Sequence, residues 1–173
     1  MKKHTIACTM AVAALFFSLN AHSQKVSTDW DHTVQSFSSF KTYNLVKPAR
    51  STGNPLMDQR IVTAIDGQMA QKGFQQVENN PDVQVTYGTG LQRQRSATAT
   101  GMGRLRMGGG MGTINENISN AGTLVIDISD AHTKQLLWRA TATDTLSDNP
   151  DKNSQKIQKA VAKMFARYPP KSK

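Results

Sequence analysis

The sequence predicts an α+β fold: a two-layer sandwich in which one largely antiparallel sheet carries two helices on one face. Three observations lead to this prediction. Several segments alternate apolar and polar residues with the period of two that half-buried strands show. Two segments repeat apolar residues every three or four positions, as amphipathic helices do. The elements follow in the order β-β-α-β-β-β-α, and the last two strands are adjacent in the chain, which favours a hairpin.

The first 23 residues are expected to be a signal peptide that lies outside this fold. Lys2 and Lys3 form a short positive region, residues 6–19 are mostly apolar, and Ala21-His22-Ser23 places small residues before a cleavage site. The apolar run is shorter than the roughly 20 residues that a membrane-spanning helix needs. We therefore expect cleavage after Ser23, export to the periplasm or the outer membrane, and one folded domain over residues 24–173.

The composition excludes several classes of site. The chain of 173 residues has one cysteine, Cys8, within the predicted signal peptide, so neither a disulfide framework nor a cysteine metal centre is expected. The formal net charge is +9, from 21 Lys and Arg against 12 Asp and Glu. Such a basic chain can bind nucleic acid, but export would separate it from most nucleic acid, and aromatic residues make up only 6%. No nucleic-acid partner is therefore expected.

Two short strands and a helix open the predicted domain. The strands are expected at residues 24–32 and 41–46. The helix should begin at Asn54-Pro55, because asparagine is a good N-cap and proline suits the first helical turn, and should end at Gly73. Its apolar face consists of Met57, Ile61, Ile65 and Met69.

Three further strands are expected at residues 83–87, 124–129 and 136–143. A polar turn separates the last two strands and predicts a hairpin between them. Asp127 and Arg139 both face away from the apolar side of this hairpin. We therefore expect these two side chains to pair across the strands.

A second helix closes the domain. It should begin at Asn149-Pro150 and end before Pro169-Pro170. Its apolar face consists of Ile157, Ala160, Val161, Met164, Phe165 and Tyr168. With the strands, this face predicts a buried framework made of Tyr43, Ile61, Ile65, Met69, Val83, Val85, Ile126, Trp138, Val161 and Phe165.

Residues 88–121 interrupt the pattern with a segment rich in glycine, arginine and methionine. Gly-rich polar segments of this length are expected to be flexible loops, here the tip of a hairpin between two strands. An alternative is a docking surface for an anionic envelope component, such as lipid phosphate or an acidic glycan. Its binding residues would be Arg93, Arg95, Arg104 and Arg106.

Two other interpretations of this segment are weaker. Met102, Met107 and Met111 are thioethers of the kind that select Cu(I), but no His or Cys supports them. The string GMGRLRMGGGMG does not match a phosphate-binding loop and does not lie between a strand and a helix. We therefore expect neither a metal nor a cofactor.

A stripe of basic residues follows one side of the last helix: Lys152, Lys156, Lys159, Lys163 and Arg167. One interpretation is a surface that meets an anionic membrane or partner. The other is a solvated helix face whose aliphatic stems cover the edge of the core. The apolar face beside the stripe is needed for the core, which favours the second interpretation.

No pattern of catalytic residues stands out. His32 lies close to Asp29 and Asp31, but a hydrolytic or metal site would need further partners. The sequence contains no G-x-S-x-G and no H-E-x-x-H motif. We therefore expect a protein that is not an enzyme.

Five segments of the chain together resemble the bacterial domain-of-unknown-function family 4136 (DUF4136), a group of exported envelope proteins and lipoproteins. They are VSTDWDHTVQSFSSFKTYNLV at 26–46, NPLMDQRIVTAIDGQMAQKGF at 54–74, PDVQVTYG at 81–88, GTLVIDISDAHTKQLLWRATATDTL at 122–146 and DNPDKNSQKIQKAVAKMFARYPP at 148–170. Many members carry a lipid-anchored cysteine after the signal peptide, whereas Cys8 lies near its start. Ala140 stands where glycine is common after Trp-Arg. The resemblance implies a fold and a compartment and supplies no catalytic residue.

Together these features predict an exported, non-catalytic interaction or accessory module of the bacterial cell envelope, whose partner is another envelope protein. The alternative is a binder of anionic envelope lipid or glycan through the four arginines and the terminal lysines. The sequence leaves the oligomeric state open.

Overall fold

The structure, a computed structural model, describes residues 24–34, 36–47, 54–100 and 113–170. It confirms the predicted α+β class, with a six-stranded open sheet and two α-helices. The elements are β1 (Lys25–Trp30), a short 3-10 turn (Phe37–Ser39), β2 (Thr42–Val46), α1 (Pro55–Gln71), β3 (Gln75–Gln76), β4 (Val83–Thr100), β5 (Thr113–Asp130), β6 (Leu136–Thr145) and α2 (Pro150–Phe165). In the described part of the chain, no helix is both long and apolar enough to cross a membrane.

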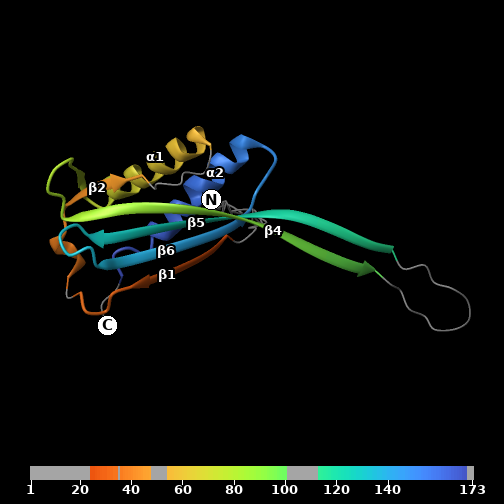
Figure 1. Cartoon of the computed structure of the whole chain (residues 1–173), viewed down its shortest axis with the longest axis horizontal. Helices are drawn as coiled ribbons and strands as arrows, with labels where there is room; N and C mark the ends of the chain where they lie inside the picture. The colour runs from red at the N-terminus through yellow and green to blue at the C-terminus, as the bar shows by residue number, and fades with distance from the viewer. Residues whose placement is uncertain (1–23, 35, 48–53, 101–112, 171–173) are drawn as a thin grey trace, which may run out of the picture.

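The sheet is largely antiparallel, as predicted, and its strand order is β1-β6-β5-β4-β2-β3. Antiparallel pairs join β1 to β6, β6 to β5 and β5 to β4. The strand β2 pairs in parallel with both β3 and β4. This part is parallel because the chain crosses from β2 through α1 before it returns to the sheet, and such a connection brings the strands back in the same direction. Both helices lie on one face of the sheet (Figure 1).

Both helices begin at the predicted Asn-Pro pairs. The Asn54 side chain accepts hydrogen bonds from the backbone N–H groups of Leu56 and Met57, at 3.1 and 3.2 Å. The Asn149 side chain accepts from Asp151 and Lys152, at 2.8 and 3.3 Å. These bonds satisfy N–H groups that have no partner inside the helix.

Replacing Asn149 by alanine is expected to lower the free energy of unfolding by about 1 kcal/mol, because two backbone N–H groups of α2 lose their acceptor. Asn149→Asp keeps an acceptor oxygen and adds a negative charge at the positive end of the helix, so it should cost almost nothing. Urea denaturation of the three proteins measures the difference. Equal losses in the two variants would contradict this role for the cap.

The core fills the space between the sheet and the helices. Every member of the predicted framework is buried: Tyr43, Ile61, Ile65, Met69, Val83, Val85, Ile126, Trp138, Val161 and Phe165. The centre is aromatic, since the ring of Trp138 lies 5.5 Å from that of Phe165 and 5.3 Å from that of Tyr168. The sequence therefore predicted correctly the buried residues that it named on β2, α1, β4, β5, β6 and α2.

The predicted loop over residues 88–121 is wrong in its bounds. β4 continues to Thr100 and β5 begins at Thr113, so strands occupy both ends of this segment. The strands stay paired from Leu91↔Gly122 out to Thr100↔Thr113. The sequence did not show this because the segment lacks an apolar alternation, whereas backbone pairing between two strands does not require one.

Beyond the body of the protein, β4 and β5 form a two-stranded ribbon, residues 92–100 and 113–120. β6 follows β5 only as far as the pair Ala121↔Thr145, and β2 follows β4 only as far as Val46↔Thr86. The ribbon therefore has one free edge on each strand, and Figure 1 shows it projecting well past the helices and the other strands.

Candidate functional site

The basic stripe of α2 is partly used by the fold. Lys152, Lys159 and Lys163 are exposed. Lys156 is half-buried: its ammonium lies 3.4 Å from Oδ1 of Asp144 and also donates to the carbonyl oxygen of Thr145. This cation therefore holds α2 against the end of β6.

Arg167, at the end of the stripe, is held in the same way. Its guanidinium Nη1 donates to the carbonyl oxygen of Val26 at 2.9 Å and fastens the chain after α2 to β1. The other three lysines of the stripe face solvent, which agrees with the interpretation of the stripe as a solvated helix face.

Of the four candidate arginines of the glycine-rich segment, only two lie among the described residues. Arg93 is exposed on β4, and Arg95 follows it on the same strand, opposite Ile118 of β5. Arg104 and Arg106 lie outside the described residues, as do Met102, Met107 and Met111 of the copper hypothesis. The structure thus places two of the four arginines on the ribbon.

The carboxylates near His32 serve the backbone turn after β1. Asp31 Oδ1 accepts hydrogen bonds from the backbone N–H and the hydroxyl of Thr33, at 2.8 and 2.7 Å. The carboxylate of Asp29 accepts from the N–H of Trp30, and the ring of His32 lies 4.0 Å from the ring of Trp30. Within the described ranges, no three His, Cys, Asp or Glu side chains gather as a metal site would require.

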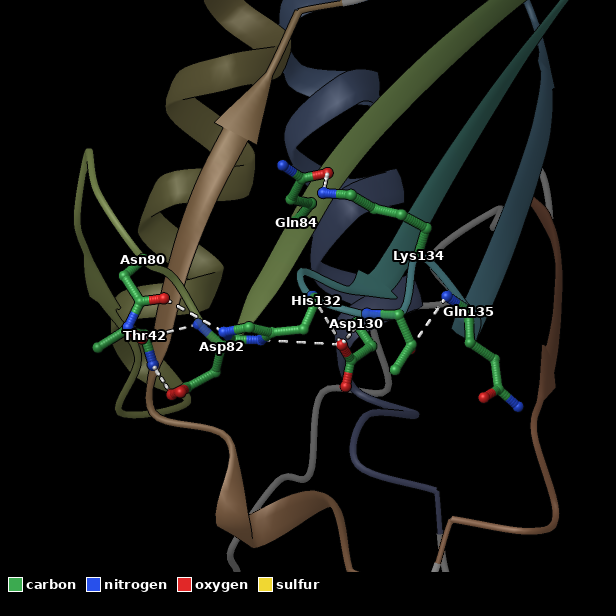
Figure 2. Close-up of polar contacts among 9 residues, drawn as sticks. Thr42, Asn80, Asp82, Gln84, Asp130, His132, Lys134 and Gln135 are labelled. Atoms are coloured by element: carbon green, nitrogen blue, oxygen red, sulfur yellow. Dashed lines mark hydrogen bonds and ion pairs between the residues drawn. The ribbon is translucent and has the colours of Figure 1, made fainter.

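A polar network ties the strand ends at the opposite end of the sheet from the ribbon (Figure 2). Asp82 Oδ2 accepts from the backbone N–H groups of Lys41 and Thr42, both at 2.8 Å, while the N–H of Asp82 donates to the hydroxyl of Thr42. The Asn80 side chain meets His132 Nε2 at 3.2 Å. These bonds join the start of β2, the entry to β4 and the turn after β5.

Two carboxylates of this network have lowered pKa values. Hydrogen bonds from the backbone of Lys41 and Thr42 lower the pKa of Asp82. The backbone of Thr133, and to a smaller extent that of His132, does the same for the pKa of Asp130. At the turn after β1, the hydroxyl and the backbone of Thr33 lower the pKa of Asp31. All three groups favour the charged form because donors point at it.

Acid is therefore expected to destabilise the protein in a defined window. A carboxylate with a lowered pKa binds protons less readily in the folded chain than in the unfolded one, so its contribution is present above the ordinary value of 3.8. That contribution is lost as the pH falls below this value and through the pKa of the folded protein. The free energy of unfolding, measured in urea from pH 6 down to pH 2, should drop below about pH 4.

Asp82→Asn isolates one of these groups. The asparagine oxygen can still accept the two backbone hydrogen bonds but cannot titrate, so the variant should lose less stability than the wild type between pH 4 and pH 2. Parallel curves for the two proteins would show that Asp82 does not contribute to the acid sensitivity.

The predicted pair between Asp127 and Arg139 is confirmed. The guanidinium donates from Nε to Asp127 Oδ1 at 2.7 Å and from Nη2 to Oδ2 at 2.6 Å. The two residues lie directly opposite each other on β5 and β6. Asp127 alternates with the buried Ile126 and Ile128, which face the helices, so this pair lies on the other face of the sheet and joins β5 to β6 there.

A cavity of about 490 Å³ lies where the ribbon leaves the body. Its floor is the end of the sheet, and its walls come from the first half of both helices. The floor includes Gln24, Leu91, Leu124, Gly122 and Asp144, and the walls include Met57, Ile61, Lys156, Ile157 and Ala160. The lining is mainly apolar, and neither Asp29, Asp31 nor His32 contributes to it.

Comparison with known proteins identifies the family. The model of the family described as "Domain of unknown function (DUF4136)" matches residues 26–170. The chain belongs to the DUF4136 family. No curated protein matches the sequence.

Solved structures that are similar to this DUF4136 chain have little sequence in common with it. A PDZ domain protein from Parabacteroides distasonis is 15% identical, with a TM-score of 0.56 over 84% of this chain and 35% of its own. The chain thus spans about a third of the length of that protein. The PelC dodecamer from Paraburkholderia phytofirmans is 12% identical, with a TM-score of 0.48 over 83% of this chain and 96% of its own.

The cavity of this DUF4136 chain was not predicted from the sequence. Gly122 and Leu91 fell inside or next to the segment read as a loop, yet the register places them opposite each other on β5 and β4. Leu91 is 79% exposed, which is unusual for a leucine in a strand. One signal was available: Leu91 continues the alternation of Val83, Val85 and Tyr87 and so belongs to the helix-facing side.

Proposed function

We propose that this chain is an exported, non-catalytic interaction module of the bacterial cell envelope, and that the β4–β5 ribbon is the element that docks to its protein partner. The observation that carries the proposal is the ribbon itself. Its strands remain paired for eight residues beyond the last strand pair with β6.

A two-stranded ribbon of this kind contributes little stability by itself. An isolated two-stranded hairpin is marginally stable in water because it has no second layer to cover it. Each of its outer edges also presents backbone N–H and C=O groups that another strand can pair with. Proteins recognise extended segments in this way, with main-chain hydrogen bonds supplying affinity. The ribbon therefore suits a partner that adds a strand or covers one of its faces.

The proposed location in the cell envelope is supported by the N-terminal sequence. Its positive start, apolar run and small residues before Gln24 match a secretory signal. Mass spectrometry of the protein recovered from the cell envelope should find a chain that begins at Gln24. A chain that begins at Met1 and stays in the cytoplasm would overturn this part of the proposal.

Two shortened variants test the ribbon. In the first, Asn-Gly replaces residues 92–121, so that Leu91 and Gly122 are joined by a two-residue turn suited to a hairpin. In the second, Asn-Gly replaces only residues 101–112, which leaves both ribbon strands in place. A photo-crosslinking residue is also placed at Thr98 of the ribbon, in the wild type and in the second variant, which both retain this position. The same residue at Gln155, on the exposed side of α2, is the control.

We expect a crosslinked protein partner from position 98 in intact cells and none from position 155. Pull-down of that partner should fail with the first variant and succeed with the second. Retention of the partner by the first variant would overturn the ribbon as the docking element. Loss with both variants would instead assign the interaction to residues 101–112.

A second candidate function is binding of anionic envelope lipid or glycan. It is favoured by the exposure of Lys152, Lys159 and Lys163 on α2 and of Arg93 at the start of the ribbon. Charge-driven association weakens as salt screens it, so 1 M NaCl should release the protein from membranes. Replacing Arg93, Arg95, Arg104 and Arg106 by glutamine should abolish this retention. Retention that resists salt would exclude the second candidate.

A further inference from the structure

Strand β1 forms one outer edge of the sheet and is long enough to pair with another strand (Figure 1). It pairs with β6 on one side only, whereas β3, at the opposite edge of the sheet, has just two residues. A free strand edge presents backbone N–H and C=O groups to any other extended chain, and proteins usually protect such an edge. Whether β1 can be paired therefore depends on which of these groups are already used.

The strand register shows which residues of β1 face the free edge. Asp31, directly after β1, donates its backbone N–H to the carbonyl oxygen of Leu137 in β6 at 2.9 Å, so the odd-numbered residues face β6. In an antiparallel strand, the backbone groups of successive residues point to opposite sides. The backbone groups of Val26, Thr28 and Trp30 therefore point to the free edge.

Two side chains of the same protein occupy one backbone group at each end of this edge. The carbonyl oxygen of Val26 accepts a hydrogen bond from Nη1 of Arg167 at 2.9 Å, and the N–H of Trp30 donates to Oδ1 of Asp29, also at 2.9 Å. Between them, both backbone groups of Thr28 have no hydrogen-bond partner among the described residues. The edge is thus closed at its two ends and open in the middle.

The two occupied groups would bond to each other in one arrangement. A second copy of this chain can pair its β1 antiparallel to the first, with a two-fold axis at Thr28. Val26 then lies opposite Trp30 of the second copy, and the N–H of Trp30 meets the carbonyl oxygen of Val26. These are the groups that Arg167 and Asp29 occupy in the single chain.

The side chains of β1 also match each other in this arrangement. On the face of the sheet away from the helices, Lys25 lies opposite Asp31 of the second copy, which pairs opposite charges. On the helix-facing side, half-buried Val26 lies opposite half-buried Trp30, so each covers apolar surface of the other. Cross-strand pairs of both kinds stabilise antiparallel sheets. The strand is therefore self-complementary in charge and in apolar surface.

We propose that β1 is a self-pairing edge that Arg167 and Asp29 keep closed. While both side chains hold their backbone groups, the sheet ends at β1. When they are released, β1 pairs with β1 of a second copy of this chain, and the two sheets join across the two-fold axis. Closure of β1 is independent of whether the ribbon binds a protein.

Two double variants test the closure by sedimentation velocity over a range of protein concentrations. Asp29→Ala with Arg167→Met removes the acceptor and the donor, whereas Asp29→Asn with Arg167→Lys keeps one of each. We expect the first double variant to self-associate at least about tenfold more tightly than the wild type, and the second to behave as the wild type does. Arg167→Met alone should give a smaller increase. Equal self-association of all the proteins, or an equal increase in both double variants, would overturn the proposal.

Disulfide cross-linking tests the register of the pairing. With the two-fold axis at Thr28, Ser27 lies opposite residue 29 of the second copy, within the distance that a disulfide spans. One protein carries Ser27→Cys, Asp29→Ala and Arg167→Met, the other carries Asp29→Cys and Arg167→Met, and Cys8→Ser is present in both. On mild oxidation, the mixture should form several-fold more cross-linked dimer than either protein alone. Equal yields would show that the copies associate elsewhere and would overturn self-pairing of β1.

Discussion

Trp138→Ala is expected to lower the free energy of unfolding by about 3–5 kcal/mol, the largest loss that we expect from a single substitution in this protein. Trp138 is fully buried near the start of β6, with its ring against Phe165 and Tyr168. Truncation removes this apolar contact and leaves a cavity that the strand and α2 can close only in part. Since domains of this size lose about 2–4 °C per kcal/mol, the midpoint of thermal unfolding should fall by about 6–20 °C.

Trp138→Phe separates packing from polar interactions at the same position. The indole Nε1 is buried without a hydrogen-bond partner among the described residues, so its removal sacrifices no hydrogen bond. We expect Trp138→Phe to cost well under half of the alanine loss, with both values taken from urea denaturation. A phenylalanine variant as unstable as the alanine variant would mean that the indole nitrogen makes an essential bond, which contradicts the packing explanation.

The core of this fold could be predicted because the residues that form it repeat with the period of their element. Val83 and Val85 alternate along a strand, while Ile61, Ile65 and Met69 recur every four positions along a helix, and all of them are buried. Periodicity is a local property, so a single sequence carries it in full. The helix ends were predictable for the same reason, since asparagine and proline act within one turn.

The ribbon and the cavity depend on which residues of different strands lie opposite each other, and the periodicity of one segment does not give this information. The sequence of the ribbon strands shows no apolar alternation, and their extent follows from the continued backbone pairing of β4 with β5. The cavity requires Gly122 of β5 to lie opposite Asp144 of β6, and Gln24, the residue before β1, to line the same space, which follows from how the strands pair. β3, with two residues, is too short for any alternation to show.

Ala140→Phe should destabilise the protein by the opposite mechanism. Ala140 lies two residues after Trp138 on the same face of β6, is fully buried, and faces the helices. A phenyl ring in this close-packed position must push α2 away or force its neighbours out of their preferred rotamers, at a cost of about 2–3 kcal/mol. Ala140→Gly, which adds no volume, should cost about 1 kcal/mol through the greater freedom of the strand backbone.

Combining Trp138→Ala with Ala140→Phe tests whether the two substitutions affect one shared region of the core or destabilise the protein independently. If the two side chains compete for one volume beneath α2, the ring at position 140 can enter the space vacated at position 138. The double variant should then lose at least about 1 kcal/mol less than the sum of the single losses, which lies within the range of coupling between residues in contact. Urea denaturation of all four proteins in the cycle measures this coupling. Additive losses would show that the two positions pack against separate parts of the helices, and that α2 does not rest on β6 as one continuous layer.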